Sequence, residues 1–124
     1  MNDPIGAQLK KEEWKEILNN TSLTKAIDIK TIIEFANGEE YTSAGSKVAP
    51  KIGLPNVGTI NLNFFRYASK IAKEYDVKFL QYGNKESYWR LFFNGYKHAG
   101  YFLWQVRSEL IEALIELNKI ERQN

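Results

Sequence analysis

The 124-residue chain contains no cysteine, one histidine and only three aspartates, at positions 3, 28 and 76. Without cysteine, the chain can form neither a disulfide framework nor a thiolate metal site. A zinc site needs three or four nitrogen, sulfur or oxygen ligands, whereas His98 is expected to lie alone on a polar loop. No aspartate has an evident place beside it, as a Ser-His-Asp triad requires. The sequence therefore predicts neither a metal site nor a hydrolase triad.

Motifs of other enzyme classes are missing as well. Asp76-Val77-Lys78 has the acid-x-Lys form of metal-dependent nucleases. That chemistry also needs a second acid placed to share Mg²⁺, and no aspartate precedes a suitable strand. Neither of the Gly-rich phosphate-binding loops, GxxxxGK[ST] or GxGxxG, occurs. We therefore expect a protein that is not an enzyme and carries no cofactor.

Long apolar runs are also absent. The first residues hold no apolar stretch of the length that a signal peptide needs. No window approaches the roughly 18 apolar residues of a membrane span. These absences, together with the lack of cysteine, predict a cytoplasmic protein without a membrane partner. The length is that of a single domain over residues 1–124, with frayed ends at 1–6 and 121–124.

The net charge is only +2, but the charged residues are unevenly distributed along the chain. Residues 1–60 carry seven basic and eight acidic side chains, and residues 108–124 carry two and four. Residues 61–107 carry eight basic and three acidic side chains, a net charge of +5. A local basic surface of this kind is what an anionic partner needs. The alternative is a solvated face with a chance imbalance.

The spacing of apolar residues predicts an α+β fold in which helices come first. Helices are expected over four segments: 9–18, 24–36, 44–52 and a fourth that begins at Thr59 or Asn61 and runs to about residue 75. The residues from Gly53 to Gly58 are typical of a turn between the last two of these helices. A three-stranded antiparallel sheet is then expected from three strands: 77–82, 88–93 and 101–106. Ser108 is expected to cap a closing helix that runs to about residue 120.

Helix, turn, helix and then a strand pair with basic residues is the layout of a winged helix. In a helix-turn-helix, the second helix lies in the major groove with its early residues near base edges. Asn61, Asn63 and Arg66 would face bases, because Asn can pair with adenine and Arg with guanine. Lys70 and Lys73 continue the exposed ridge of Asn63 and Arg66 and would meet phosphate. The alternative is a pair of helices packed in a generic α+β domain.

Two loops are candidates for the wing, residues 83–87 and residues 94–100. Lys97 is expected at the tip of the second loop and Arg90 on the strand before it, and both would face phosphate. The alternative is an ordinary hairpin with a polar end. The many aromatic residues nearby form either a stacking platform for bases or a core under a small sheet. In the second case we expect the C-terminal helix to cover the outer aromatic face.

Several short stretches resemble one known domain. They are Asn61-Leu62-Asn63 with Arg66, then Tyr88-Trp89-Arg90, Gly95, the run FLWQVRSEL from Phe102 to Leu110, and Ala113-Leu114. Over about residues 25–117 the chain resembles a winged-helix-like domain that accompanies nuclease domains in bacterial restriction endonucleases, both HNH-type and modification-dependent. The resemblance implies a target-sensing role in a restriction or defence system, with a nuclease domain or subunit as a partner. It implies no catalytic residues, and these 124 residues depart from the pattern because they include no nuclease domain.

The sequence thus predicts a winged-helix-like α+β domain that binds double-stranded DNA without catalysis. The residues predicted to contact DNA are Asn61, Asn63, Arg66, Lys70, Lys73, Arg90 and Lys97. The competing hypothesis is a protein-interaction module, a small adaptor or inhibitor that uses the aromatic sheet and the C-terminal helix. It is motivated by the low total charge and by the aromatic residues on both faces of the 88–93 segment.

Overall fold

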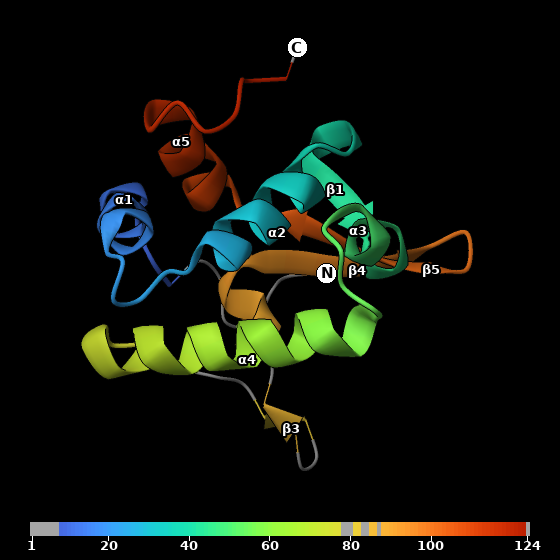
Figure 1. The fold of residues 1–124 in the computed structure, drawn as a ribbon, viewed down its shortest axis with the longest axis horizontal. Helices are drawn as coiled ribbons and strands as arrows, with labels where there is room; N and C mark the ends of the chain where they lie inside the picture. The colour runs from blue at the N-terminus through green and yellow to red at the C-terminus, as the bar shows by residue number, and fades with distance from the viewer. Residues whose placement is uncertain (1–7, 78–80, 83–84, 87, 124) are drawn as a thin grey trace.

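The computed structural model describes residues 8–77, 81–82, 85–86 and 88–123, shown in Figure 1. It confirms the predicted α+β class, a three-stranded antiparallel sheet and a closing helix. The five helices are α1 (Lys11–Asn19), α2 (Ala26–Ala36), α3 (Gly45–Lys51), α4 (Val57–Glu74) and α5 (Ser108–Glu116). The sheet consists of β1 (Thr42–Ala44), β4 (Phe93–His98) and β5 (Tyr101–Val106). The remaining elements are the 3₁₀ helices η1 (Glu39–Tyr41) and η2 (Tyr88–Leu91) and the strands β2 (Gln81–Tyr82) and β3 (Lys85–Glu86).

Only one strand of the sheet lies where the sequence predicts it. The strand order is β1-β5-β4, and the first strand pairs Thr42 with Gln105 although they are far apart in sequence. The predicted strand over 88–93 is wrong, because residues 88–91 form η2 and the strand begins at Phe93. Leu91, Phe92 and Phe93 are all buried. A strand sends successive side chains to opposite faces, so the 3₁₀ turn is what lets all three enter one core.

The segment from residue 77 to residue 87 departs from the prediction too. Residues 81–82 of the expected 77–82 strand pair with residues 85–86 in a separate two-stranded sheet. Residues 78–80 of that strand lie outside the described residues, as do 83, 84 and 87 of the first wing candidate. The second wing candidate, residues 94–100, belongs to the hairpin formed by β4 and β5.

Aromatic rings from distant segments meet in the core. The ring centroid of Phe64 on α4 lies 4.9 Å from that of Phe92, and Trp14 on α1 lies 5.6 Å from the same ring. Phe35 on α2 stacks on Trp104 of β5 at 5.5 Å. Aromatic pairs of this kind contribute about 0.5–1.5 kcal/mol beyond their burial. The core therefore joins α1, α2 and α4 to the sheet and fixes which face of α4 points outward.

The two helices of the predicted helix-turn-helix correspond to α3 and α4, joined by residues 52–56 (Figure 1). Gly53 has a φ of +76°, a left-handed conformation that glycine adopts without a side-chain penalty. Asn56 caps α4, because its side-chain oxygen accepts a hydrogen bond from the Thr59 N–H at 3.0 Å. The helix therefore begins two residues before the predicted Thr59. Pro50 lies inside α3, which has only seven residues.

Two residues near the C-terminus, Arg122 and Gln123, hydrogen-bond to other parts of the fold. The backbone N–H of Gln123 donates to the hydroxyl of Tyr41 at 2.7 Å, and its side-chain amide donates to the carbonyl of Gly38 at 2.8 Å. The Arg122 guanidinium makes two hydrogen bonds of 2.7 Å to the carboxylate of Glu112 on α5. Residues 1–6, also expected to fray, lie outside the described residues.

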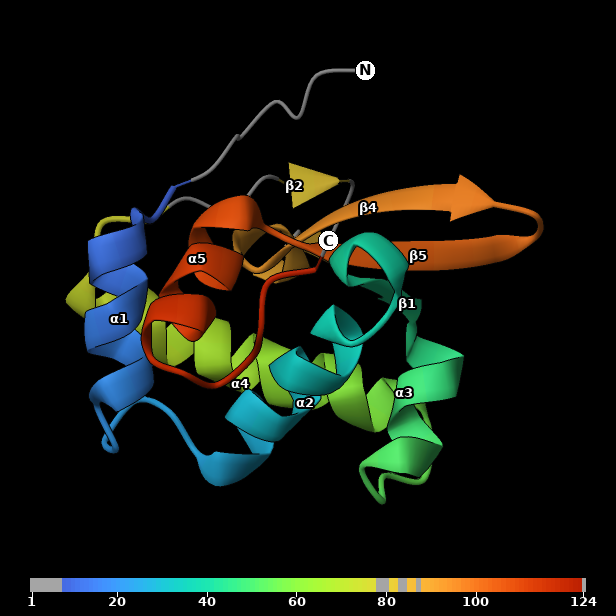
Figure 2. The same cartoon turned by 90° about the horizontal axis from the view of Figure 1, so that it is seen from above.

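The β4–β5 hairpin extends beyond α3 at one end of the molecule (Figure 2). Its turn consists of Ala99 and Gly100, whose φ angles of +52° and +84° are both positive. Two-residue type I′ turns require positive φ at both positions and favour Asn-Gly. An L-residue with a Cβ atom is strained there by about 1–2 kcal/mol. Ala99 is therefore a weak point in the hairpin.

Ala99→Asn should raise the free energy of unfolding by about 0.5–1 kcal/mol, because asparagine tolerates the left-handed conformation better than alanine. Urea unfolding followed by circular dichroism measures the change. Gly100→Ala is the matched control and should lower the stability, since φ is also positive at that position. A loss of stability in Ala99→Asn would contradict this account of the turn.

Candidate nucleic-acid interface

Helix α4 divides cleanly into a core side and a solvent side. Its buried residues are Ile60, Phe64, Tyr67, Ala68 and Ile71. Between these positions, Arg66 and Lys73 are exposed, and Asn63 and Lys70 are half-buried. Residues three and four apart are neighbours on a helix surface. These four residues therefore form one side of α4, as their spacing predicts.

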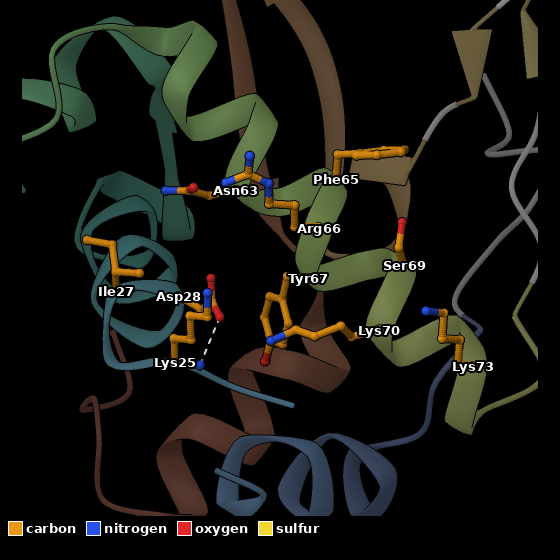
Figure 3. A pocket seen from close by; sticks show the side chains of 10 residues that line it. All are labelled: Lys25, Ile27, Asp28, Asn63, Phe65, Arg66, Tyr67, Ser69, Lys70 and Lys73. Carbon is orange, nitrogen blue, oxygen red and sulfur yellow. Dashed lines mark hydrogen bonds between the residues drawn. The ribbon is translucent and has the colours of Figure 1, made fainter. Parts of the chain in front are cut away.

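A cavity of about 370 Å³ lies between the N-terminal part of α2 and the solvent side of α4 (Figure 3). Four of its lining side chains are cationic: Lys25, Arg66, Lys70 and Lys73. Asp28 is the one carboxylate among the described residues that line it, so the cavity carries a net charge of +3. Asn63 lines it too. The structure thus brings together four of the seven predicted contact residues and adds Lys25.

Asp28 is only 5% exposed at the base of this cavity. Its carboxylate accepts a hydrogen bond from the backbone N–H of Lys25 at 2.9 Å, which caps the first turn of α2. Burial raises the pKa of Asp28, while the Lys25 N–H and the charge of Lys70 act in the opposite direction. Within the described residues, no three His, Cys, Asp or Glu side chains gather as a metal site requires. Asp28 therefore serves here as a helix cap and a counter-charge.

A buried hydrogen-bond chain holds the walls of the cavity together. Tyr67 on α4 is 1% exposed, and its hydroxyl lies 2.7 Å from the hydroxyl of Thr24, just before α2. Thr24 donates its proton to the carbonyl of Ile17 on α1 at 2.7 Å, so Tyr67 must donate to Thr24. Burial raises the pKa of the Tyr67 hydroxyl. The chain ties α4 to the connection between α1 and α2 and thereby sets the width of the cavity.

The other three predicted contact residues lie elsewhere. Asn61 is half-buried, and its side-chain oxygen is buried without a hydrogen-bond partner among the described residues. Arg90 lies on η2, and not on a hairpin strand as predicted, with its guanidinium 4.9 Å from the ring centroid of Trp89. Lys97 is exposed on β4, next to the hairpin turn. Of these three, Lys97 alone is exposed, and it lies on strand β4 and not in the predicted loop.

The β4–β5 hairpin carries exposed aromatic side chains on both faces. Strand alternation places Phe102, Trp104 and Val106 on one face, as predicted, and Trp104 and Val106 are buried. Phe102 is 43% exposed on that face, and Tyr96 is 43% exposed on the other. Helix α5 packs mainly against α1, and the side chain of Tyr96 on the outer face stays exposed. The hairpin therefore presents aromatic rings to solvent on both sides.

Comparison of the chain with protein-family models, curated proteins and solved structures finds no match. None of the helices in the described part of the chain has the length and apolar character needed to cross a membrane. The features with evident binding chemistry are the cationic cavity beside α4 and the aromatic hairpin.

Tyr67→Phe should lower the free energy of unfolding by about 1–2 kcal/mol at pH 7–9, because it leaves Thr24 without its buried partner. The deficit should shrink as the pH rises above 10. Above this pH the unfolded parent loses the Tyr67 proton, whereas the folded parent retains it, so the parent becomes less stable. The variant has no hydroxyl at this position and is not destabilised in this way. Urea unfolding at a series of pH values measures both effects.

Tyr96→Phe is the control, since its hydroxyl is on an exposed hairpin residue. This variant should match the parent at pH 7–9. A deficit in Tyr67→Phe that stayed constant through alkaline pH would show that Tyr67 ionises equally easily in the folded and unfolded chains.

Proposed function

We propose that this chain is a winged-helix domain that binds double-stranded DNA and catalyses no reaction. The observation that carries the proposal is the cavity of net charge +3 on the second helix of a helix-turn-helix pair. Lys and Arg side chains that neutralise phosphates supply most of the affinity of proteins for DNA. The cationic side chains come from two separate helices, so the basic surface is wider than one helix ridge.

The order of the elements supports the winged-helix assignment. From α2 onward, the α-helices and the strands of the three-stranded sheet follow the order helix, strand, helix, helix, strand, strand, and the first of these strands pairs with the last. The separate β2–β3 strand pair comes between α4 and β4. In this arrangement α4 is the recognition helix and the β4–β5 hairpin is the wing. The helix-turn-helix places its second helix in the major groove. Figure 2 shows the hairpin reaching out past α3.

The contacts divide into two kinds. Arg66 and Asn63 lie nearest the bases, where their side chains can make bidentate hydrogen bonds to guanine and adenine. Lys25, Lys70 and Lys73 contact phosphates and set the register of the helix on the duplex. Lys97 adds a phosphate contact from the hairpin. Asn61 and Arg90 are left out of this contact set, because one has a buried amide oxygen and the other lies over Trp89.

A second candidate function is favoured by a different observation. Leu62 and Phe65 are 46% and 44% exposed on α4, beside the basic side. Exposed apolar side chains that cluster are typical of protein-binding surfaces. In this alternative the chain is an interaction module, with a nuclease subunit as the partner that the sequence resemblance implies. The module would use α4, and not the predicted α5, in which Leu110, Ile111, Ala113 and Leu114 are buried.

The variant Lys70→Gln/Lys73→Gln should weaken binding to all duplex sequences alike, because both side chains contact phosphate. The slope of log affinity against log salt concentration should become shallower by about 1.8, at roughly 0.9 for each phosphate that a lysine no longer neutralises. Fluorescence anisotropy on mixed-sequence duplexes, titrated at several salt concentrations, measures both quantities.

The matched control is Lys30→Gln/Lys119→Gln, which removes the same charge from two exposed lysines that do not line the cavity. It should keep the salt slope of the parent. Equal losses in both double variants would mean that only total charge matters. Undiminished binding by Lys70→Gln/Lys73→Gln would show that α4 is not the groove helix, and no binding by the parent at about 50 mM salt would overturn DNA binding altogether.

Sedimentation velocity separates the second candidate from the first. We expect the parent to be monomeric over a wide concentration range and Leu62→Ser/Phe65→Ser to sediment identically and keep the parent's salt slope. A dimer of the parent that this double variant abolishes would favour the interaction module, because it would assign the exposed apolar pair on α4 to a protein contact.

A further inference from the structure

A second, smaller cleft lies where the start of α3, the first turn of α4 and the β4–β5 hairpin meet. It measures about 240 Å³ and is lined by Ala44, Gly45, Ser46, Val57, Gly100, Tyr101, Phe102 and Trp104. None of these described lining residues is charged. Pockets for drug-sized ligands span roughly 300–1,000 Å³. The cleft is therefore the right size for a ligand of one or two rings.

The aromatic wall of the cleft is held rigidly from behind. Trp89 meets the ring of Phe102 edge-on, at 5.7 Å and 87°, and stacks on Trp104 at 5.9 Å and 6°. Gly95 makes this packing possible, because a Cβ atom there would lie 2.8 Å from both Trp89 and Phe102. Phe102 is nevertheless 43% exposed. A fixed and partly open ring is what a stacking surface requires, since little side-chain freedom is lost on binding.

Cations stand beside the cleft although none lines it. The ammonium of Lys47 on α3 lies 5.4 Å from the ring centroid of Tyr101. Lys97 is the register partner of Phe102 on the neighbouring strand and is exposed. An uncharged aromatic cleft with one cation near the ring of Tyr101 and another beside Phe102 matches a flat ring attached to an anionic backbone. Nucleic-acid bases on their phosphate chain have this chemistry.

We propose that this cleft receives a single nucleobase that is turned out of the duplex contacted by α4. The inference rests on the proposed DNA binding, because α4 and the hairpin must lie against the same duplex. The base stacks on Phe102, and Lys47 and Lys97 hold the flanking phosphates. Turning out a paired base costs its pairing and stacking energy. DNA that already carries an unpaired base should therefore bind more tightly than fully paired DNA.

The test compares a matched duplex with the same duplex carrying one bulged adenine, by anisotropy at fixed salt. The parent should bind the bulged duplex at least about tenfold more tightly, since the bulged base needs no unpairing. Phe102→Ala should weaken binding to the bulged duplex by about 5- to 100-fold, the usual effect of removing one base–aromatic stack. Its affinity for the matched duplex should stay unchanged, because phosphate contacts dominate there.

Tyr96→Ala is the matched control. Tyr96 and Phe102 have the same exposed fraction, 43%, on opposite faces of one hairpin, so Tyr96→Ala should keep the preference for the bulge. Phe102→Leu is the second variant if Phe102→Ala unfolds, because leucine retains apolar volume in the cluster but lacks a flat ring. It should lose the preference as well.

The outcomes separate this inference from the proposed function. Equal affinity of the parent for both duplexes overturns the base-binding cleft and leaves DNA binding by α4 intact. A preference for the bulge that Phe102→Leu retains, or that Tyr96→Ala removes, overturns the cleft as the place where the base binds. Failure of the parent to bind either duplex overturns both proposals together.

Discussion

The contact between Phe64 of α4 and the two consecutive rings of Phe92 and Phe93 determines how the rest of the surface is arranged. The centroid distances are 4.9 and 5.2 Å, and all three side chains are at most 2% exposed. With Phe64 locked inward, helical geometry turns Arg66 and Lys70 away from the core. One apolar contact thus sets the direction of the basic side of α4, although it contributes no charge itself.

The cationic cavity and the aromatic cleft depend on the same core. Trp104 stacks on Phe35 within the core and, through Trp89, supports the ring of Phe102 at the cleft. Close packing of interiors transmits small shifts between such neighbours. The cationic side chains repel one another, and buried Asp28 offsets part of that repulsion while capping α2. The proposed binding surface and the stability of the fold therefore depend on the same core.

The spacing of apolar residues along the sequence predicts the helices well and the sheet poorly. Each of the five expected helices has a counterpart, because an amphipathic period marks a helix from within its own sequence. The strand at 101–106 and its alternation were also predictable. The pairing of Thr42 with Gln105 was not, since strand partners are chosen by which buried faces meet. The run of aromatic residues at 88–93 suggested a strand, but three consecutive buried side chains required the turn of η2.

In the candidate site, too, the local sequence sets some features and tertiary packing sets the others. The sequence by itself determined that Asn63, Arg66, Lys70 and Lys73 share one side of α4, because residues three and four apart are neighbours on any helix. Only the tertiary structure decided that Lys25, far away along the chain, completes the cavity. It also decided that the side-chain oxygen of the predicted Asn61 is buried. The period of a helix is fixed by its own backbone, whereas the face that meets solvent is fixed by what packs against the helix.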